Sequence, residues 1–423
     1  MSSLVTTDIQ AAIEQHIEGK SRASAGFFQV PFRGGDLKLK LVRVHTEYLA
    51  TLGPARHFAC VDLVGTQGPI YDVDFFLSGP PGAMTVRETH VHKINAQPLY
   101  TWDQRSNGTW RRVPVTQATP RLLGVVKGTD AFEFTYRVKL PLITNTARMW
   151  LPLAQPDQFQ TVEVRGITAP CQVRELTEPA HGNKVLFFEP NAAASGQTVE
   201  VRYRILRTEK SPYYDAGTGP EGYLASELLV PLNENFQSIA QEVTRGHATD
   251  LYRARALYNH VIERLRYAKY GSGWGRGDAV YACDARSGNC SDFHAYFIAL
   301  ARAAHIPARF AIGAAIPSER NDGGIDGYHC WAEFFTEGKW WPVDISEADK
   351  HSSLAQYYFG HHPANRIEFS RGRDLVIEPG PANGPINFLV YPVLEIGDRL
   401  VKPETTFLFR RTPRASARTS AER

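Results

Sequence analysis

The segment from 271 to 313, GSGWGRGDAVYACDARSGNCSDFHAYFIALARAAHIPARFAIG, decides how the whole chain is interpreted. A glycine-rich loop precedes Cys290, and Asn289 or Ser287 is suited to cap a helix that Pro307 ends. Apolar side chains recur after Cys290 at the spacing of one helix face: Phe293, Phe297, Leu300, Ala301 and Ala304. The pattern predicts a helix with Cys290 in its first turn.

A cysteine in that position is a candidate nucleophile. The unpaired amides and the positive end of the helix dipole stabilise its thiolate, which is the reactive form. A thiolate needs a base and an orienting partner. The segment from 327 to 346, GYHCWAEFFTEGKWWPVDIS, offers His329 on one expected strand and Asp344 on the next.

The geometry of a hairpin tests whether these two residues meet. A turn centred on Glu337 and Gly338 sets Asp344 opposite Trp331. His329 lies two residues before Trp331 on the same face, so Asp344 is its diagonal neighbour. A hydrogen bond from the imidazole to the carboxylate is therefore expected.

These residues resemble the transglutaminase-like superfamily. GNCSDFHAYFIALARAAHIPAR looks like the nucleophile helix and its exit, with His305 in place of the usual glycine, and HCWAEFF and WWPVD look like the histidine and aspartate strands. The resemblance covers about 230 to 350. It implies a papain-like α/β core in which Cys290 is the nucleophile, His329 is the base and acid, and Asp344 orients the imidazole.

The resemblance also implies acyl transfer on a peptide or amide bond through a thioester, and hydrolysis is preferred over transamidation because water is the ubiquitous acceptor. The amide of Cys290 and Trp274 are the candidate oxyanion donors, and a loop anchor or cleft wall is the alternative role for Trp274. Arg309 and Glu333 match the family pattern, and an ion pair explains them without catalysis. No cofactor is expected, because an EF-hand pattern and paired CxxC zinc motifs are missing from the sequence.

Two other functions stay open. The first is a zinc site with ligands from this region: Cys283, Cys290, His294 and either His329 or Cys330. Strand alternation sends His329 and Cys330 to opposite faces, which argues against it. The second is a non-catalytic protein that binds a peptide or protein partner in a transglutaminase-like cleft. The intact trio of chemically competent residues argues against that function.

Residues 1–118 are expected to form an N-terminal α+β module that contributes no catalytic residues. Isoleucines at helical spacing open it, and four strands follow, at 37–44, 57–64, 71–77 and 84–95. In the strand 71–77, alternation predicts a sheet with one buried face. His90 and His92 share a strand face, but no third ligand is apparent nearby, so a solvated face is expected.

The rest of the chain completes a multidomain α+β fold. Short alternating strands predict a β-sandwich over 119–212, and the catalytic domain with a β-rich end is expected over 213–409. Arginines in 410–423 suggest a disordered basic tail.

Composition narrows the classes of function. The 423 residues are 43% hydrophobic and 22% charged, with a net charge of +3, so a folded protein without the basic surface of a nucleic-acid binder is expected. Neither an apolar span nor a signal peptide is visible in the sequence, which favours a cytoplasmic location without a membrane span. A periplasmic or secreted location stays open for a chain from which a leader was removed. The sequence leaves the oligomeric state and the natural substrate open.

Overall fold

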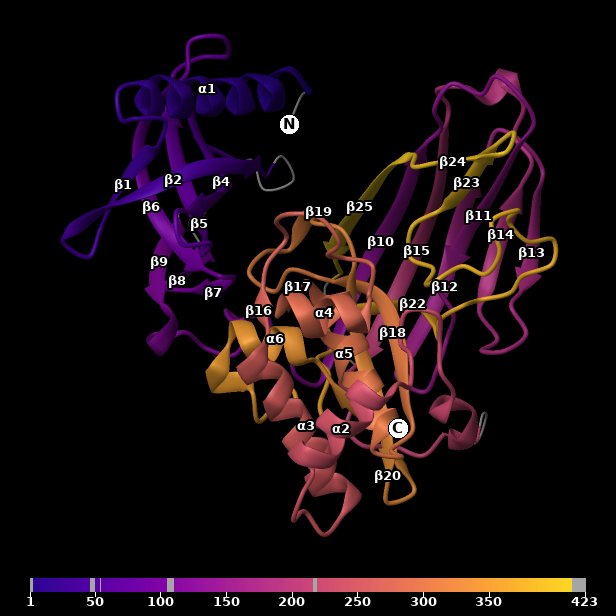
Figure 1. Ribbon diagram of the computed structural model, residues 1–423. Helices are drawn as coiled ribbons and strands as arrows, with labels where there is room; N and C mark the ends of the chain where they lie inside the picture. The colour runs from indigo at the N-terminus through magenta and orange to yellow at the C-terminus, as the bar shows by residue number, and fades with distance from the viewer. Residues whose placement is uncertain (1–2, 46–49, 54, 105–109, 216–218, 413–423) are drawn as a thin grey trace, which may run out of the picture. The chain divides into compact units, whose positions relative to one another are not determined.

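The computed structural model describes residues 3–45, 50–53, 55–104, 110–215 and 219–412 (Figure 1). The fold is mixed α+β, as predicted. The chain divides into two compact units, each built from separated segments. Unit 1 comprises Met1–Leu123, Leu229–Ala304 and Asp344–Phe359, and unit 2 comprises Gly124–Leu228, His305–Val343 and Gly360–Arg423. The expected domain boundaries near 118 and 212 stay predictions.

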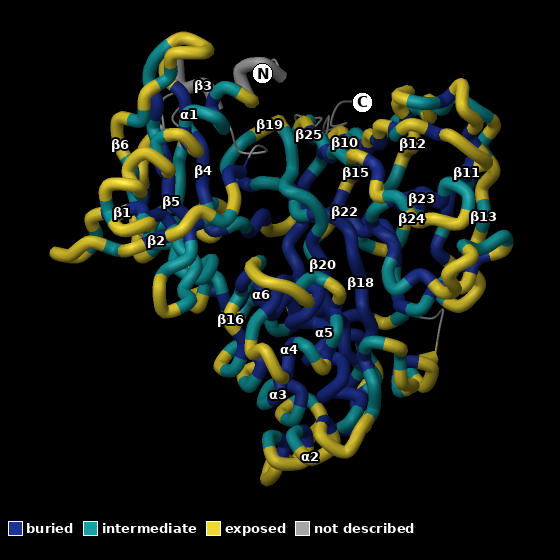
Figure 2. The backbone as a smooth tube through the Cα atoms, turned by 45° about the horizontal axis from the view of Figure 1, so that its top comes forward, coloured by how far each residue is buried: buried dark blue, intermediate teal, exposed yellow. Residues whose placement is uncertain are grey.

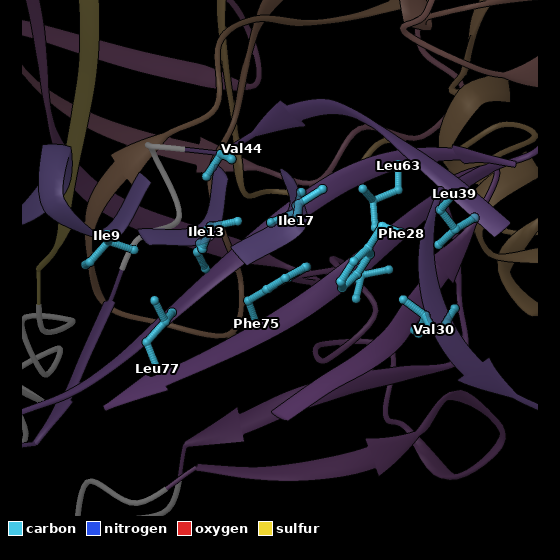
Figure 3. Packing of buried hydrophobic residues seen from close by; sticks show 14 residues of the cluster. Ile9, Ile13, Ile17, Phe28, Val30, Leu39, Val44, Leu63, Phe75 and Leu77 are labelled. Atoms are coloured by element: carbon cyan, nitrogen blue, oxygen red, sulfur yellow. The ribbon is translucent and has the colours of Figure 1, made fainter. Parts of the chain in front are cut away.

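The N-terminal part of unit 1 is a helix packed on an antiparallel sheet. The helix α1 spans Ser3–Arg22. The sheet has the order β1-β2-β4-β5-β6-β7, with β3 paired to β4. Its strands are β1 (Phe28–Phe32), β2 (Gly35–Val44), β3 (Ala50–Gly53), β4 (Arg56–Gly65), β5 (Ile70–Ser78), β6 (Thr85–Ile94) and β7 (Gln97–Pro98). Ile9, Ile13 and Ile17 of α1 pack in one core with Phe75 and Leu77 of β5 (Figure 3).

The opposite face of this sheet is covered as well. A hairpin of β8 (Tyr100–Gln104) and β9 (Trp110–Pro114) follows the sheet. The expectation of one buried face is therefore incomplete, because Asp72 and Asp74 of β5 are buried too. Trp102 of the hairpin donates to Asp74 through Nε1 over 3.1 Å, so the second face buries polar groups beneath aromatic rings.

The helical part of unit 1 surrounds one central helix, α5 (Cys290–Ala303). The other helices are α2 (Glu234–Val243), α3 (Asp250–Arg264), α4 (Ala279–Ala285) and α6 (Ile345–Lys350), and each of them contacts α5. Every residue from Cys290 through Arg302 is buried, and α5 is accordingly dark blue in Figure 2. Two short parallel strands, β16 (Arg266–Tyr267) and β17 (Ser287–Gly288), precede it.

Unit 2 contains the expected β-sandwich as two five-stranded sheets, ordered β12-β15-β10-β25-β19 and β13-β14-β11-β23-β24. The strands inside 119–212 are β10 (Thr129–Lys139), β11 (Ala147–Leu153), β12 (Gln160–Thr168), β13 (Val173–Thr177), β14 (Lys184–Phe188) and β15 (Thr198–Thr208). Later parts of the chain supply β19 (Asp322–Ile325), β23 (Val393–Ile396), β24 (Arg399–Val401) and β25 (Glu404–Arg411).

The C-terminal strand corrects one expectation. Arg410 and Arg411, the first two residues of the expected disordered tail, lie in β25. Arg411 is fixed there because its guanidinium pairs with the Asp130 carboxylate over 3.1 Å. Residues 413–423 of the expected tail lie outside the described residues.

A third, four-stranded sheet of unit 2 contains the strand that begins at His329. Its order is β21-β20-β18-β22, with β18 at Ala308–Ala315, β20 at His329–Thr336, β21 at Lys339–Val343 and β22 at Arg366–Arg371. Thr336 pairs with Lys339, which is the register expected from the sequence. Glu337 and Gly338 both have positive φ, 53° and 72°, as a two-residue hairpin turn requires.

An ion pair joins two strands of this sheet, as the sequence suggested. Arg309 of β18 faces Glu333 of β20, and Nε lies 2.8 Å from Oε2. Lys210 Nζ lies 3.0 Å from Oε1, and Tyr213 donates to Oε2. Burial acts to raise the pKa of Glu333, but Lys210 and Arg309 outweigh it and hold that pKa well below its usual range.

Candidate active site

Cys290 is the first residue of α5, where the sequence predicted it. Of the two proposed caps, Asn289 is the one used, and its side-chain oxygen accepts from the amide of Ser291 over 3.0 Å. Asp292 completes a capping box because its Oδ2 accepts from the amide of Asn289 over 2.9 Å. The nucleophile candidate therefore opens a helix whose N-terminus is fixed from both sides.

Asp292 also ties the glycine-rich loop to this helix. Its carboxylate accepts from the amides of Gly275, over 2.7 Å, and Gly277, over 3.0 Å. Burial raises the pKa of Asp292 to about 6, although these amides oppose the rise. Sequence reasoning gave Asp292 no role, and the Asn-x-x-Asp spacing of a capping box is the signal that identifies it.

Trp274 lies in this loop, next to Gly275. Its side chain is partly buried. The loop tip is thus anchored two residues from Cys290 along the helix, through Asp292. The role of Trp274 as an oxyanion donor stays a prediction.

Asp344 lies one residue beyond β21 and caps the next helix, α6. Its Oδ1 accepts from the amide of Glu347 and from the hydroxyl of Ser346, each over 3.2 Å. The carboxylate is fully buried. Its role as N-cap, which the sequence analysis did not assign, fixes the orientation of the carboxylate.

His294 connects Cys290 to the start of α6. Its Nδ1 lies 2.7 Å from the carbonyl oxygen of Cys290, and the amide of Ile345 donates to its Nε2 over 3.0 Å. A carbonyl only accepts and an amide only donates, so the ring is neutral with its proton on Nδ1. Both ring nitrogens of His294 already take part in hydrogen bonds. This argues against the alternative in which His294 is a zinc ligand.

His329 is the first residue of β20. It is 5% exposed, and its ring centroid lies 6.3 Å from that of Trp331. Trp331 in turn packs against His362, with ring centroids 4.2 Å apart. Because Cys290 and Asp344 belong to unit 1 and His329 to unit 2, the complete triad stays a prediction.

The thiols of Cys60 and Cys171 differ from Cys290 in their surroundings. None of the five cysteines, all of which lie in the described part of the chain, forms a disulfide. Burial raises the pKa of Cys60 well above its usual value, and the charges of Asp74 and Asp72 raise it further. Burial also raises the pKa of Cys171. Neither thiol has the helix N-terminus that would stabilise a thiolate at Cys290.

This chain is similar in sequence to known proteins. Residues 237–345 match the family model described as the transglutaminase-like superfamily. An uncharacterised protein of Haemophilus influenzae is 26% identical over 321 residues, which cover 64% of this chain and 87% of that protein.

Two solved structures show partial similarity to this chain. A candidate cysteine protease from Cytophaga hutchinsonii has a TM-score of 0.44 and 15% identity, and the match covers 68% of this chain and 99% of that one. The periplasmic domain of TgpA from Pseudomonas aeruginosa has a TM-score of 0.31 and 18% identity, over 62% of this chain and 88% of that domain.

No helix among the described residues combines the length and apolar character that crossing a membrane requires. The matched segment contains α5, which begins at Cys290, β20, which begins at His329, and Asp344, which follows the hairpin. Residues 237–345 of this chain are thus a core of the transglutaminase-like superfamily.

Proposed function

We propose that this protein is a cysteine-dependent hydrolase of peptide or amide bonds that uses Cys290, His329 and Asp344. The observation that carries the proposal is the position of Cys290 at the first residue of a capped helix inside the matched family segment. The helix N-terminus favours the thiolate, and a thiolate is the nucleophile that this chemistry needs.

The reaction follows from the chemistry of the three side chains. The Cys290 thiolate attacks the carbonyl carbon of the scissile amide, and His329 delivers a proton to the leaving amine as the C–N bond breaks. The product is a thioester on Cys290. His329 then removes a proton from water, the resulting hydroxide attacks the thioester, and the carboxylic acid leaves while the thiolate is regenerated.

The remaining groups have supporting roles in this proposal. Asp344 orients the imidazole of His329 and stabilises its protonated form. The amide of Cys290 and Trp274 receive the negative charge of the tetrahedral intermediate. Asp292 supports this arrangement because it binds the amides of Gly275 and Gly277 in the same loop.

Hydrolysis is preferred over transamidation because water is the ubiquitous acceptor and nothing in the sequence identifies an amine site. A protein that binds peptides without cleaving them is the second candidate, and only the general ability of a fold to lose its chemistry favours it. The zinc alternative is less favoured, because both ring nitrogens of His294 already take part in hydrogen bonds.

The test is cleavage of a peptide and amide library by the full chain. Cys290→Ala is the essential variant, and Cys283→Ala is the matched control because Cys283 lies on α4 of the same unit. We expect cleavage that Cys283→Ala keeps and Cys290→Ala loses. An added primary amine separates hydrolysis from transamidation through the mass of the product. Binding without turnover by the unmodified chain would favour the second candidate.

A further inference from the structure

The second face of the N-terminal sheet holds a compact set of buried metal-ligand side chains. Each of Cys60, Asp72, Asp74 and His92 offers one donor atom, and these atoms all lie within 4.8 Å of one another. All four residues are buried, and Asp74 is completely so. The set combines sulfur, nitrogen and carboxylate oxygen, which are the ligands that Zn²⁺ takes.

The sheet register explains how these four side chains meet. Cys60 of β4 is directly opposite Asp74 of β5. Asp72 lies two residues from Asp74, so the two carboxylates share the face of Cys60. On β6, Asp72 pairs with Lys93 but Val73 pairs with Val91, which leaves His92 as the extra residue of a β-bulge. Such a bulge re-aims a side chain.

A neutral His92 cannot donate a hydrogen bond to the carboxylate of Asp74 beside it. Its Nε2 lies 2.9 Å from the carbonyl oxygen of Tyr100, which only accepts, so Nε2 carries a proton. The lone pair of Nδ1 then points to Asp74 Oδ1, 3.2 Å away, and two acceptors face each other. In the described part of the chain, Nδ1 has no hydrogen-bond partner. A cation between these atoms would satisfy both.

Hydrogen bonds from neighbouring side chains hold the two carboxylates of this group in place. Tyr100 and Trp102 donate to Oδ2 of Asp74, which leaves Oδ1 for the centre of the group. Lys93 binds Oδ2 of Asp72 over 2.8 Å, and Oδ1 of Asp72 is a buried oxygen to which no described residue donates. Supporting contacts of this kind, including a carbonyl that fixes the histidine tautomer, are typical of metal sites.

We propose that Cys60, Asp72, Asp74 and His92 bind one Zn²⁺ ion in the N-terminal module. The thiol of Cys60, which donates to Asp74 Oδ1 over 3.2 Å, releases its proton to the buffer on binding. Three anionic ligands then exceed the charge of Zn²⁺ by one, and the ammonium of Lys93 balances the difference. The ion joins β4, β5 and β6, so its role is structural.

The test uses the full chain with Cys290→Ala, so that the proposed catalytic thiol cannot bind the metal and the outcome is independent of the proposed function. The metal-free protein is titrated with Co²⁺, and Zn²⁺ is then added in competition. We expect one equivalent of Co²⁺ to give a thiolate-to-cobalt absorption band, one proton to be released per ion, and Zn²⁺ to remove the band.

Variants identify the ligands. Cys60→Ser and His92→Ala should each lose the band, and Zn²⁺ should no longer raise their melting temperature. His90→Ala is the matched control: it lies opposite Asp74 in the register, but its ring contacts Glu88 and stands outside the ligand group. It should keep the band.

Two results would overturn the proposal: no band in the full chain with Cys290→Ala alone, or a band that survives the further substitution Cys60→Ser or His92→Ala. Far-UV circular dichroism checks that each variant folds. If either variant is unfolded, Asp72→Asn, which keeps the side-chain volume, takes its place. Affinity for Co²⁺ should then fall at least about tenfold, and unchanged affinity would equally rule out the site.

Discussion

The carbonyl oxygen of Cys290 accepts a hydrogen bond from Nδ1 of His294 over 2.7 Å, one helical turn along α5. The other nitrogen of the same ring accepts from the amide of Ile345, the residue that follows Asp344. Within unit 1, one neutral imidazole therefore links α5, which begins at Cys290, to the helix that Asp344 caps. A buried side chain with two such bonds is a positioning residue for both.

We expect His294→Ala to lower the free energy of unfolding by about 2 to 4 kcal/mol, because it leaves a cavity and an unpaired buried amide at Ile345. His294→Asn offers a donor in place of Nδ1 and should recover part of the loss. Urea unfolding of both variants measures this. Equal loss in the two would show that the bond to Cys290 contributes nothing.

The thiol of Cys290 should react ahead of the other four cysteines. At about pH 6, an unperturbed thiol with a pKa of roughly 8.5 is almost entirely protonated, whereas a thiolate at a helix N-terminus and beside an imidazolium stays ionised. Under limiting iodoacetamide, peptide mapping should find Cys290 labelled first, with activity lost in proportion. Cys60 should be among the slowest, since burial raises its pKa.

His329→Ala supplies the control for that experiment, because it should slow labelling of Cys290 at pH 6 and reduce the selectivity. A different cysteine labelled first in the folded protein would contradict the nucleophile assignment. So would labelling of Cys290 that leaves turnover unchanged.

Asp344→Asn should leave the protein folded and lower turnover by orders of magnitude. The amide oxygen of asparagine can still accept from Glu347 and Ser346, so the cap of α6 is kept. The amide cannot favour the imidazolium as the carboxylate does. Circular dichroism and steady-state kinetics measure the two effects separately, and full activity in this variant would remove Asp344 from the mechanism.

The hairpin turn and the helix cap near the site could be predicted from the sequence, because residues close together in the chain determine both. The turn at Glu337 and Gly338 was enough to set the register of β20 against β21. The capping side chain was narrowed to two residues, of which Asn289 is the one used. His294 received no positioning role, because nothing in its spacing to Cys290 shows that its second nitrogen meets Ile345.

Long-range pairing explains what the sequence did not predict. β25 completes a sandwich sheet beside β10, although most of the chain separates the two strands. On β6, strict alternation was expected to leave His92 in solvent, and the bulge instead directs it to Asp74. A single extra residue inverts a strand face, and a sequence pattern does not reveal where it falls.

Asp349 of α6 should make unit 1 less stable as the pH rises. Burial raises its pKa to about 7, against the opposing effects of Lys350 and Gln97. The folded state thus holds a proton that the unfolded chain releases near pH 4, so stability falls between about pH 4 and pH 7 and the loss is complete above that range.

Asp349→Asn removes this titration. We expect it to raise the melting temperature at pH 8 and to change it little at pH 4, with a gain on the order of 4 kcal/mol at most. Asp284→Asn is the control, because Asp284 is exposed on α4. A gain that is the same at both pH values would show that the carboxyl proton is not its source.

His305 follows the end of α5 with φ of 62°, in the left-handed region, where the family motif has glycine. A side chain with a Cβ costs about 1 to 2 kcal/mol there, whereas glycine adopts this conformation freely and loses about 0.5 to 1 kcal/mol through the greater entropy of the unfolded chain. His305 is exposed, so its removal leaves no cavity. His305→Gly should therefore stabilise the protein by about 0.5 to 1 kcal/mol in urea unfolding. Ala303→Gly, two residues earlier and inside the helix, should instead destabilise it by about 1 kcal/mol. If both substitutions destabilise equally, the left-handed backbone at His305 does not limit stability.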